Sequence, residues 1–530
     1  MQIRSIALIT AFAALALVAS NVSGCSSSKP NGGEPSGGGD EDSGGDGSPG
    51  TSSGCSGFCT GGAEAGETSP CVNCNMATCS GGTNTTTITG VVYDPAGSNP
   101  VYNVQVYVPS MPLPAFTQGA SCQPCSALYP GSVYASAVTG TNGAFTIKNA
   151  PSGTDVPLVI QIGKWRRQFS IPTVTGCQAN DATTLLNTSL RLPSSSSEGS
   201  LPDIAISTGG ADSLECLPLR MGVVSGEYVP GASTAGHIHI FTGGASGQAS
   251  QGALTSPASP QAYTNLWDSE HDLNVNDVVL FSCEGQPTAY LDGSDGPSNL
   301  LNYLNNGGRV FASHYHFAWF TPTSGSPANP FAALTPPLAT WSNLTNDAEI
   351  NDTVSFPADI VTTLPGGSPF PEGVALKAWL GAVNALDANG KLDLYYARMN
   401  ALVGTSNTSS QAWAALDPSV TSSDVVESGE TFTASATQYF SFDTPVGTAA
   451  AEQCGRAVYS DLHVSGGPGV EADPGVMPDY QAGGGIDIVP SGCAMRALTP
   501  QEKALEFMLF DLSSCLVPVG MNPPMMMGPQ

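Results

Sequence analysis

Charged residues are scarce in this chain, and basic residues are the scarcest. Only 11% of the 530 residues are charged, and 15 lysines and arginines stand against 43 aspartates and glutamates, for a formal net charge of −28. A surface of this sign repels nucleic-acid phosphates and anionic lipid headgroups, so neither is expected as a partner through charge. The acidic residues are spread out, without the long acidic run that marks a disordered tail.

Long hydrophobic runs are missing after the N-terminal region. Residues 6–19 are apolar and follow Arg4, a pattern typical of an export signal, which we place at residues 1–24. The run is too short to span a membrane comfortably, and no later stretch approaches the required length. The sequence therefore predicts an exported protein whose chain does not cross the bilayer.

The export signal ends in Val22-Ser23-Gly24-Cys25, which resembles the bacterial lipobox. The resemblance implies that Cys25 is lipidated after cleavage and that the protein is anchored to a membrane through this lipid. Ser26 stands where an aspartate would retain a lipoprotein in the inner membrane, so the outer membrane or the cell surface is expected. The alternative is an ordinary cleaved signal beside a chance cysteine.

Glycine, proline and cysteine are plentiful, with 62, 42 and 14 residues. This mixture suits a secreted, loop-rich and β-rich protein, and 530 residues are too many for one ordinary core. Residues 25–84 read as the lipidated Cys25, a flexible tether and a cysteine-rich neck. With Cys25 set aside, thirteen cysteines remain. This odd number means that at least one thiol is free or pairs with another molecule, while disulfides are expected for the rest.

Residues 85–212 alternate in hydrophobicity with a period of two between turn residues, as β-strands do. The expected strands are Ile88–Tyr93, Val104–Val108, Ala144–Lys148 and Pro157–Ile162. Their spacing, with Asn142-Gly143 as a tight turn, resembles the carboxypeptidase regulatory-like domain, which implies a transthyretin-like β-sandwich without catalytic residues. The basic patch at residues 164–167 is expected to form an interdomain or rim contact, with a ligand surface as the alternative.

Residues 216–516 change to strands alternating with helices, which predicts a doubly wound, flavodoxin-like α/β domain and hence a multidomain protein. The expected strands are Leu219–Ser225, His237–Phe241, Val278–Ser282, Val310–Ser313 and Arg456–Asp461, and the expected helices are Ser298–Asn306 and Thr499–Ser513. Thr499 and Glu502 are expected to form a capping box at the start of the second helix. An irregular insertion is expected at about 320–450, and a disordered tail at 517–530.

Three strand ends carry a further resemblance. Asp277-Val-Val-Leu-Phe-Ser, Gly307-Gly-Arg-Val-Phe-Ala-Ser-His314 and Gly455-Arg-Ala-Val-Tyr-Ser-Asp-Leu-His463 resemble the class I glutamine amidotransferase-like superfamily, in particular its trehalose-utilisation-protein branch. The resemblance implies that His314 replaces the nucleophilic cysteine and that His463 matches the catalytic histidine. Ser465 stands in place of the glutamate of that family, and the Gly-x-Cys-x-Gly turn is absent. We therefore exclude glutaminase activity.

Six acidic or histidine residues follow the expected strands, and the carboxyl ends of parallel strands share one sheet edge. They are Glu227, Glu284, His314, His316, Asp461 and His463. Such groups suit acid/base chemistry or a divalent metal such as zinc. The expected acid/base residues are His314, His463, Glu284 and Asp461, and the expected metal ligands are His314, His316 and His463. The alternative is that the histidines are hydrogen-bonded remnants of a lost active site. Cys283 is expected to be buried or disulfide-bonded.

Two classes of function remain open. The insertion is rich in aromatic, amide and hydroxyl side chains, which suits carbohydrate stacking, although a small β-rich lid with its own core has the same composition. We favour a non-catalytic binding or structural lipoprotein whose partner is a saccharide or a cell-envelope protein. The alternative is a hydrolase or isomerase that uses His314, His463 and a carboxylate, with or without a metal.

The lipobox leads to a direct test of localisation. We expect Cys25→Ala to leave uncleaved or soluble protein in place of a membrane-bound form, because a diacyl chain supplies far more apolar burial than the hydrophilic tether. Detergent partitioning of the two proteins measures this, and identical partitioning would exclude the anchor.

Overall fold

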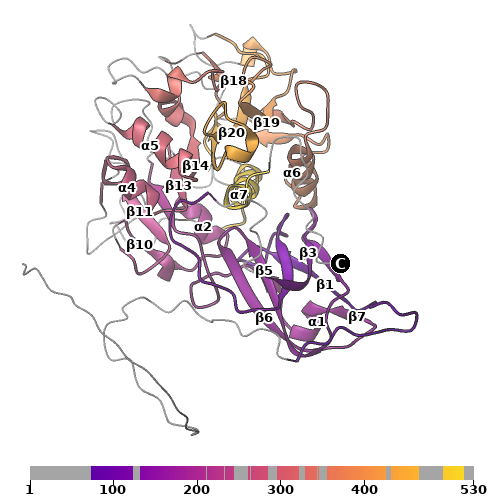
Figure 1. The fold of residues 1–530 in the computed structure, drawn as a ribbon. Helices are drawn as coiled ribbons and strands as arrows, with labels where there is room; N and C mark the ends of the chain where they lie inside the picture. Colours follow the sequence, from indigo (N-terminus) through magenta and orange to yellow (C-terminus); the bar gives the residue numbers. More distant parts are fainter. Residues whose placement is uncertain are drawn as a thin grey trace, which may run out of the picture. The chain divides into compact units, whose positions relative to one another are not determined.

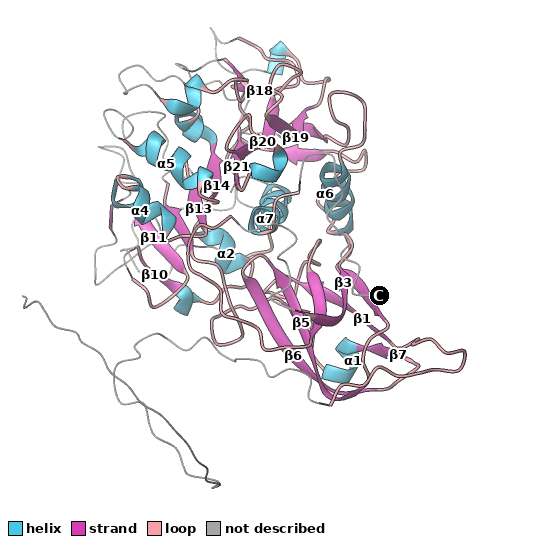
Figure 2. Ribbon diagram, in the orientation of Figure 1, coloured by secondary structure: helices cyan, strands magenta, loops and turns pink. Residues whose placement is uncertain are grey.

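The protein combines several β-sheets with a smaller number of helices in a mixed α/β architecture (Figures 1 and 2). The computed structural model describes residues 73–122, 132–209, 212–231, 233–243, 261–262, 264–283, 295–321, 329–342, 344, 355–424, 431–464, 493 and 495–517. We divide them into a β module, residues 73–200, and an α/β module, residues 204–517. The expected export signal, Cys25, most of the tether and neck, and nearly all of the tail lie outside the described residues.

The β module contains two four-stranded sheets. In one sheet β1 lies between β4 and β7, and β8 also pairs with β1. The other sheet has the order β3-β2-β5-β6. Their bounds are β1 Thr87–Tyr93, β2 Gln105–Pro109, β3 Val133–Val138, β4 Ala144–Lys148, β5 Gly153–Ile162, β6 Trp165–Val174, β7 Ala179–Asp181 and β8 Leu190–Arg191, with the short helix α1 at Ala182–Leu186. The four strands predicted from the alternating pattern are all present. Strand β6 was not predicted, because the basic residues at its start obscure the alternation of Phe169 and Ile171.

The α/β module is built on an eleven-stranded sheet in the order β10-β11-β9-β13-β14-β21-β20-β19-β16-β17, with β12 paired to β11. Neighbouring strands are parallel from β10 to β21 and antiparallel from β21 to β17. The bounds are β9 Ile204–Ser207, β10 Tyr228–Pro230, β11 Ile238–Thr242, β12 Gln261–Ala262, β13 Val278–Phe281, β14 Arg309–Ser313, β16 Phe356–Ile360, β17 Leu392–Leu394, β19 Ser410–Leu416, β20 Thr437–Thr444 and β21 Gly455–Ser460. A separate pair joins β15 (Thr340–Trp341) to β18 (Ala401–Leu402).

Helices cover both faces of this sheet. Their bounds are α2 Cys216–Arg220, α3 Thr264–Trp267, α4 Glu270–Asn274, α5 Gly296–Asn305, α6 Pro371–Ala382 and α7 Pro500–Ser513. Val278 and Leu280 of β13 belong to the same hydrophobic cluster as α2, α6 and α7. Val279 and Phe281, on the opposite face, belong to the cluster of α3, α4 and α5. Burial on both faces explains why the central strands read as continuous apolar runs.

Helix α7 contacts both modules. It begins at the predicted capping box, in which the side chains of Thr499 and Glu502 each bond the other residue's backbone N–H. On the β-module side, Phe507 stacks on Tyr102 with ring centroids 5.8 Å apart, and Phe510 packs edge-on against Trp165 at 6.0 Å. Residues 61–530 accordingly form one compact unit that includes both modules.

Three parts of the α/β module differ from the sequence-based predictions. Leu219–Ser225 is not a strand, because Leu214, Leu217 and Met221 are buried at helical spacing and residues 216–220 form α2. Strand β9 belongs to the large sheet although it precedes residue 216, where we expected that domain to begin. The insertion at 320–450 supplies β16, β17, β19 and β20, which extend the sheet in an antiparallel manner instead of forming an irregular segment.

Disulfides are present, as predicted from the cysteine count. Cys79 pairs with Cys177, Cys122 with Cys454 and Cys216 with Cys493, and Cys74 and Cys515 are also disulfide-bonded. The Cys122–Cys454 bond links a loop of the β module to the α/β module. Such cross-links indicate an oxidising, extracytoplasmic environment. Cys283 is buried and does not take part in a disulfide.

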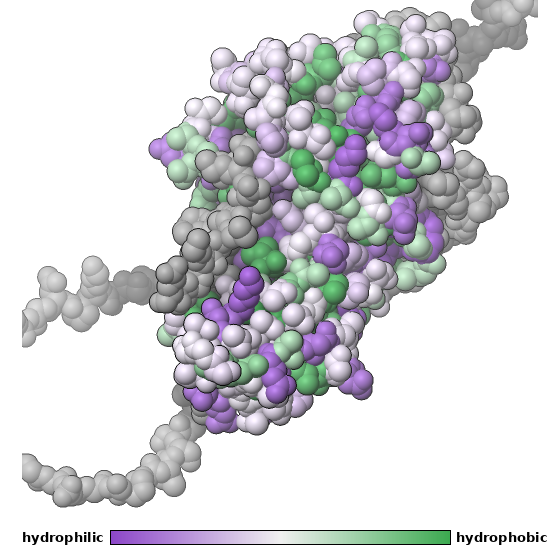
Figure 3. Space-filling model, turned by 90° about the vertical axis from the view of Figure 1, so that its right-hand side faces the viewer, coloured by the Kyte–Doolittle hydropathy of each residue, from purple (hydrophilic) through white to green (hydrophobic). Residues whose placement is uncertain are grey.

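Neither the face drawn in Figure 3 nor the helices of the described residues show a large apolar element. On the face drawn in Figure 3, hydrophobic residues are scattered among hydrophilic ones instead of gathering in a broad patch. Among the described residues, no helix combines the length and the hydrophobicity that crossing a bilayer requires.

A buried pair of carboxyl groups at the junction of the modules leads to a prediction about stability and pH. Glu506 of α7 is fully buried beside Asp94, and it accepts a hydrogen bond of 2.7 Å from Asn99. Burial and the nearby Asp94 raise the pKa of Glu506 well above 4.5. An acid whose pKa is raised by folding stabilises the protein below its unfolded pKa, and this stabilisation is lost as the pH rises through the folded pKa.

We therefore expect the free energy of unfolding to decline between pH 5 and 8 less steeply in Glu506→Gln than in the wild type. The glutamine amide can donate to Asp94 without a titrating proton, and each pKa unit corresponds to about 1.4 kcal/mol. Urea unfolding across this pH range measures the effect, with the exposed Glu452→Gln as the control. Parallel curves for the wild type and Glu506→Gln would contradict the prediction.

Candidate functional site

The parallel register of three neighbouring strands brings Cys283, His314 and His463 together. Phe281 of β13 pairs with Ala312 of β14, and Ser313 of β14 pairs with Ser460 of β21. Each of the three residues follows its strand by one to three positions, so all three lie at the carboxyl edge of the sheet. This is the edge at which open α/β sheets place ligands and chemistry.

His314 occupies a sharp turn from strand to helix. Strand β14 ends at Ser313, and a 3-10 helix, η3 (His314–Trp319), begins directly afterwards. His314 itself has a φ of 52°, in the left-handed region that a residue with a side chain rarely adopts. Its carbonyl oxygen accepts a hydrogen bond of 2.7 Å from the hydroxyl of Tyr459 in β21. The backbone here makes a sharp turn from strand to helix, with His314 at the turn.

The three side chains are in mutual contact and sealed from solvent. The Sγ of Cys283 lies 3.4 Å from the Nδ1 of His314. The rings of His314 and His463 are stacked, with centroids 3.7 Å apart and an angle of 18° between their planes. Cys283 and His314 are 0% exposed and His463 is 1% exposed. One possible ligand atom from each residue lies within 4.8 Å of the other two.

Burial makes the charged form of the His314 imidazole unfavourable. Desolvation lowers the pKa of His314 well below 6.5, and His463, Arg398 and His316 lower it further through charge repulsion. The ring is therefore neutral at physiological pH and offers a lone pair. A neutral imidazole beside a thiol suits metal binding, whereas general acid/base catalysis also requires a path for the substrate to the ring.

Asp461 supports the backbone near the site instead of reaching an imidazole nitrogen. Its Oδ2 accepts bonds of 2.8 Å and 3.1 Å from the backbone N–H groups of Asn400 and Ala401, and its Oδ1 lies 2.9 Å from the hydroxyl of Tyr459. Burial raises its pKa, while the charge of Arg398 acts in the opposite direction. Asp461 therefore positions the segment at residues 398–401 against β21.

The remaining predicted site residues lie elsewhere. His316 uses both ring nitrogens in the core, because its Nδ1 accepts a bond of 2.9 Å from Trp319 and its Nε2 lies 2.8 Å from the carbonyl oxygen of Ser282. Glu227 precedes β10 and contacts His237, which precedes β11, so it lies at the amino ends of these parallel strands. Glu284 lies outside the described residues.

Asp212 was missed by the sequence analysis. It is buried just after β9, its Oδ2 lies 4.0 Å from the Nδ1 of His463, and it accepts a hydrogen bond of 3.1 Å from the backbone N–H of Val464. Its signal in the sequence is the short run Ile204–Ser207, which Thr208 and two glycines follow. Because these residues fall within the β-sandwich expected at 85–212, the sequence does not place Asp212 at this edge.

The aromatic residues of the insertion are mostly in the core. Trp319, Trp379 and Trp413 are buried, and Trp341 is half-buried against Phe440. Trp319 stacks on Phe281 with ring centroids 4.9 Å apart. These tryptophans belong to the two hydrophobic clusters of the α/β module, so they are part of its main core and not of a small lid with a core of its own. They do not offer a surface for stacking on a sugar.

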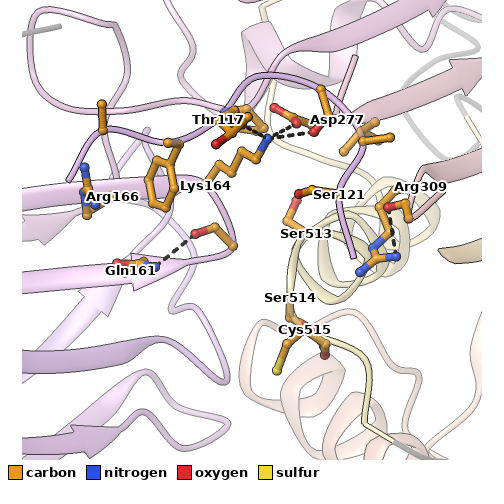
Figure 4. Close-up of a pocket in the computed structure, with 18 of the residues that line it drawn as sticks. Thr117, Ser121, Gln161, Lys164, Arg166, Asp277, Arg309, Ser513, Ser514 and Cys515 are labelled. Carbon is orange, nitrogen blue, oxygen red and sulfur yellow. Dashed lines mark hydrogen bonds and ion pairs between the residues drawn. The ribbon is translucent and has the colours of Figure 1, made fainter. Parts of the chain in front are cut away.

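An open cavity of about 310 Å³ lies at the opposite, amino edge of the sheet (Figure 4). Its walls come from the loop at 114–121 and strands β5 and β6 of the β module, and from residues before β13 and β14 and after α7. Lys164 donates to the carbonyl oxygens of Thr117 and Gly119 and forms an ion pair with Asp277. The prediction that this basic patch forms an interdomain contact is thus confirmed for Lys164.

Comparisons with known proteins do not assign a family to this chain. No protein-family model and no curated sequence matches it. A β-galactosidase from Rahnella matches at 11% identity and a TM-score of 0.24, over 50% of this chain and 29% of that enzyme. A ThuA-like protein from Bacteroides uniformis matches at 9% identity and a TM-score of 0.24, over 49% of this chain and 80% of that protein. A chain of a type II cohesin–X-dockerin complex from Acetivibrio cellulolyticus matches at 14% identity and a TM-score of 0.15, over 29% of this chain and 88% of that one. Each likeness is remote, and the matched part spans less than a third of the β-galactosidase.

The hydroxyl of Tyr459 gives a test of how the turn at His314 is held. We expect Tyr459→Phe to lower the free energy of unfolding by about 1–3 kcal/mol. The carbonyl oxygen of His314 and the carboxylate of Asp461 would lose the hydroxyl as a hydrogen-bond partner while they remain buried. Urea denaturation measures the change, with Tyr134→Phe in the half-exposed strand β3 as the control. Equal stability of the two variants would show that the hydroxyl does not support the turn.

Proposed function

We propose that this protein is a lipid-anchored, extracytoplasmic binding protein without catalytic activity. Its anchor is the diacylated Cys25, its membrane is the outer membrane or the cell surface, and its ligand is a small polar molecule of the saccharide class. In this proposal the β module is a transthyretin-like sandwich, and the α/β module is a degenerate amidotransferase-like domain that has lost its nucleophile.

The strand order supports the proposed type of α/β domain. The three-residue strand β10 lies at the edge of the parallel part of the sheet and is set aside here. The next five strands in the sheet are β11, β9, β13, β14 and β21, which are the second, first, third, fourth and fifth of this set in chain order. The order 2-1-3-4-5 is that of flavodoxin-like folds. The fourth strand of this order, β14, ends directly before His314, the position at which the resemblance to amidotransferases places the nucleophilic cysteine.

The observation that carries the proposal is the contrast between the two edges of the sheet. At the carboxyl edge, His314 and His463 are 0% and 1% exposed, so a substrate has no access to either ring. At the amino edge, the cavity of about 310 Å³ is open and falls within the size range of small-molecule sites. Binding at the amino edge therefore fits the molecule better than catalysis at the carboxyl edge.

The cavity offers groups that suit a saccharide. The hydroxyl side chains of Thr117, Ser121 and Ser513 line the cavity and can exchange hydrogen bonds with sugar hydroxyls. Phe116 is half-buried at the rim, where the guanidinium of Arg166 lies 4.1 Å from its ring centroid. Aromatic rings of this kind pack against the apolar faces of sugars. Saccharide binding is therefore supported by the residues of this cavity and not by the aromatic residues of the insertion.

The alternative function is a hydrolase or isomerase that uses His314, His463 and a carboxylate. The hydrogen bonds of Asp461 to backbone N–H groups weigh against its acting as the carboxylate partner. Burial of both imidazoles weighs against the class as a whole. Turnover of a glycoside or ester that disappears in His314→Ala would favour the enzyme and overturn the proposal.

Binding at the cavity can be measured with a panel of cell-envelope and plant oligosaccharides by titration calorimetry. We expect Phe116→Ala to raise the Kd of a bound saccharide by roughly two- to twelvefold, since an aromatic contact contributes about 0.5–1.5 kcal/mol. Met111→Ala is the matched control, because Met111 is exposed on the same loop outside the cavity lining. A wild type that binds none of the panel, or a Phe116→Ala variant with unchanged affinity, would contradict saccharide binding at this site.

A further inference from the structure

The buried contact between Cys283 and His314 has the dimensions of a metal site. Zinc bonds of about 2.3 Å to sulfur and 2.0–2.1 Å to nitrogen, at a tetrahedral angle, place two such ligand atoms about 3.6 Å apart. The Sγ of Cys283 and the Nδ1 of His314 are 3.4 Å apart. These two atoms therefore need almost no movement to share one ion.

His463 supplies a third ligand with a carboxylate behind it. Its Nδ1 lies 4.0 Å from the Oδ2 of Asp212, which leaves Nε2 as the nitrogen that faces the cluster when it binds. Metal-bound histidines commonly direct their other ring nitrogen to a carboxylate, which fixes the tautomer and increases the basicity of the ligand. Asp212 is placed for this role.

We propose that Cys283, His314 and His463 bind one transition-metal ion of the zinc class, positioned by Asp212, as a structural site at the carboxyl edge of the sheet. The site differs from the set expected from sequence, since Cys283 takes the place of His316. The ring nitrogens of His316 are engaged by Trp319 and Ser282. This inference goes beyond the proposed ligand binding, which concerns the opposite edge, so either can fail without the other.

Binding requires one movement in the cluster. The rings of His314 and His463 are stacked at 3.7 Å, and two parallel imidazoles cannot both direct in-plane lone pairs at one ion. One ring must therefore turn about its Cβ–Cγ bond, a torsion with a broad range in histidine. His314 is held by its backbone turn and by Cys283, so the ring that turns is that of His463.

The local charges are compatible with a divalent ion. A thiolate from Cys283 and the carboxylate of Asp212 together balance two positive charges, and both imidazoles bind in the neutral form. The positive charge of Arg398 acts on His314 and would repel a metal ion there. The buried carboxyl of Asp461 also interacts with Arg398 and reduces this repulsion. The full burial of the ligands corresponds to a closed structural site instead of an open catalytic one.

Cobalt binding to the full-length protein tests the proposal, because a thiolate ligand gives cobalt a charge-transfer absorption that nitrogen and oxygen ligands do not. Because the cluster is sealed, metal is exchanged by unfolding the protein in urea with a chelator and refolding it with its disulfides intact. The wild type refolded with Co²⁺ is expected to bind one equivalent with this absorption, and one equivalent of Zn²⁺ added before refolding should prevent it. Cys283→Ser should lose the absorption. Asp212→Asn should keep it with a Kd raised roughly 10- to 100-fold.

His271→Ala is the matched control, because His271 is exposed on α4 and represents adventitious binding by a surface histidine. It should behave as the wild type. Circular dichroism checks that each variant is folded, and His463→Gln replaces Cys283→Ser if the latter is not. A wild type without thiolate–cobalt absorption, or a folded Cys283→Ser that retains it, would overturn the site.

Discussion

The parallel register of β13, β14 and β21 is the constraint on which the rest of the α/β module depends. These strands are buried on both faces, so their backbone N–H and C=O groups must pair with one another, and the pairing determines which residues leave the sheet together. Cys283, His314 and His463 meet for this reason alone. A shift of one residue in any of the three strands would exchange its two faces and disperse the cluster.

The sequence predicted the strands that frame this cluster and the capping box of α7, because short apolar runs and a Thr-x-x-Glu pattern are local signals. It did not predict β9, which is four residues long and lies beside residues that resemble another domain. Asp212, which follows β9, was therefore not predicted as a site residue. Nor did the sequence distinguish His314 from His316, since only the fold shows that His316 is engaged by Trp319 and Ser282. Aromatic residues in the insertion gave no sign of their burial, because composition alone does not separate a surface from a core.

Helix α7 and the cavity show how the two modules are joined. The helix packs between the large sheet and the β module, with Phe507 on Tyr102 and Phe510 on Trp165. The Cys122–Cys454 disulfide adds a covalent link across the same junction. Lys164 and Asp277 meet where the packing is incomplete, and the cavity remains beside them. The open cavity thus lies at the junction of the two modules, whereas the sealed cluster of Cys283, His314 and His463 lies within the α/β module at the end of its sheet.

The carboxyl edge of the sheet is sealed from solvent, and the reactivity of the Cys283 thiol is the most direct test of this. Alkylation of the native protein by iodoacetamide in the presence of a chelator, followed by mass spectrometry of the peptide that contains Cys283, reports access to the cluster. We expect Cys283 to be modified only at the rate of global unfolding in the native protein and to react promptly in denaturant. Rapid modification under native conditions would contradict it, because an open carboxyl edge would again admit a substrate to His314 and His463.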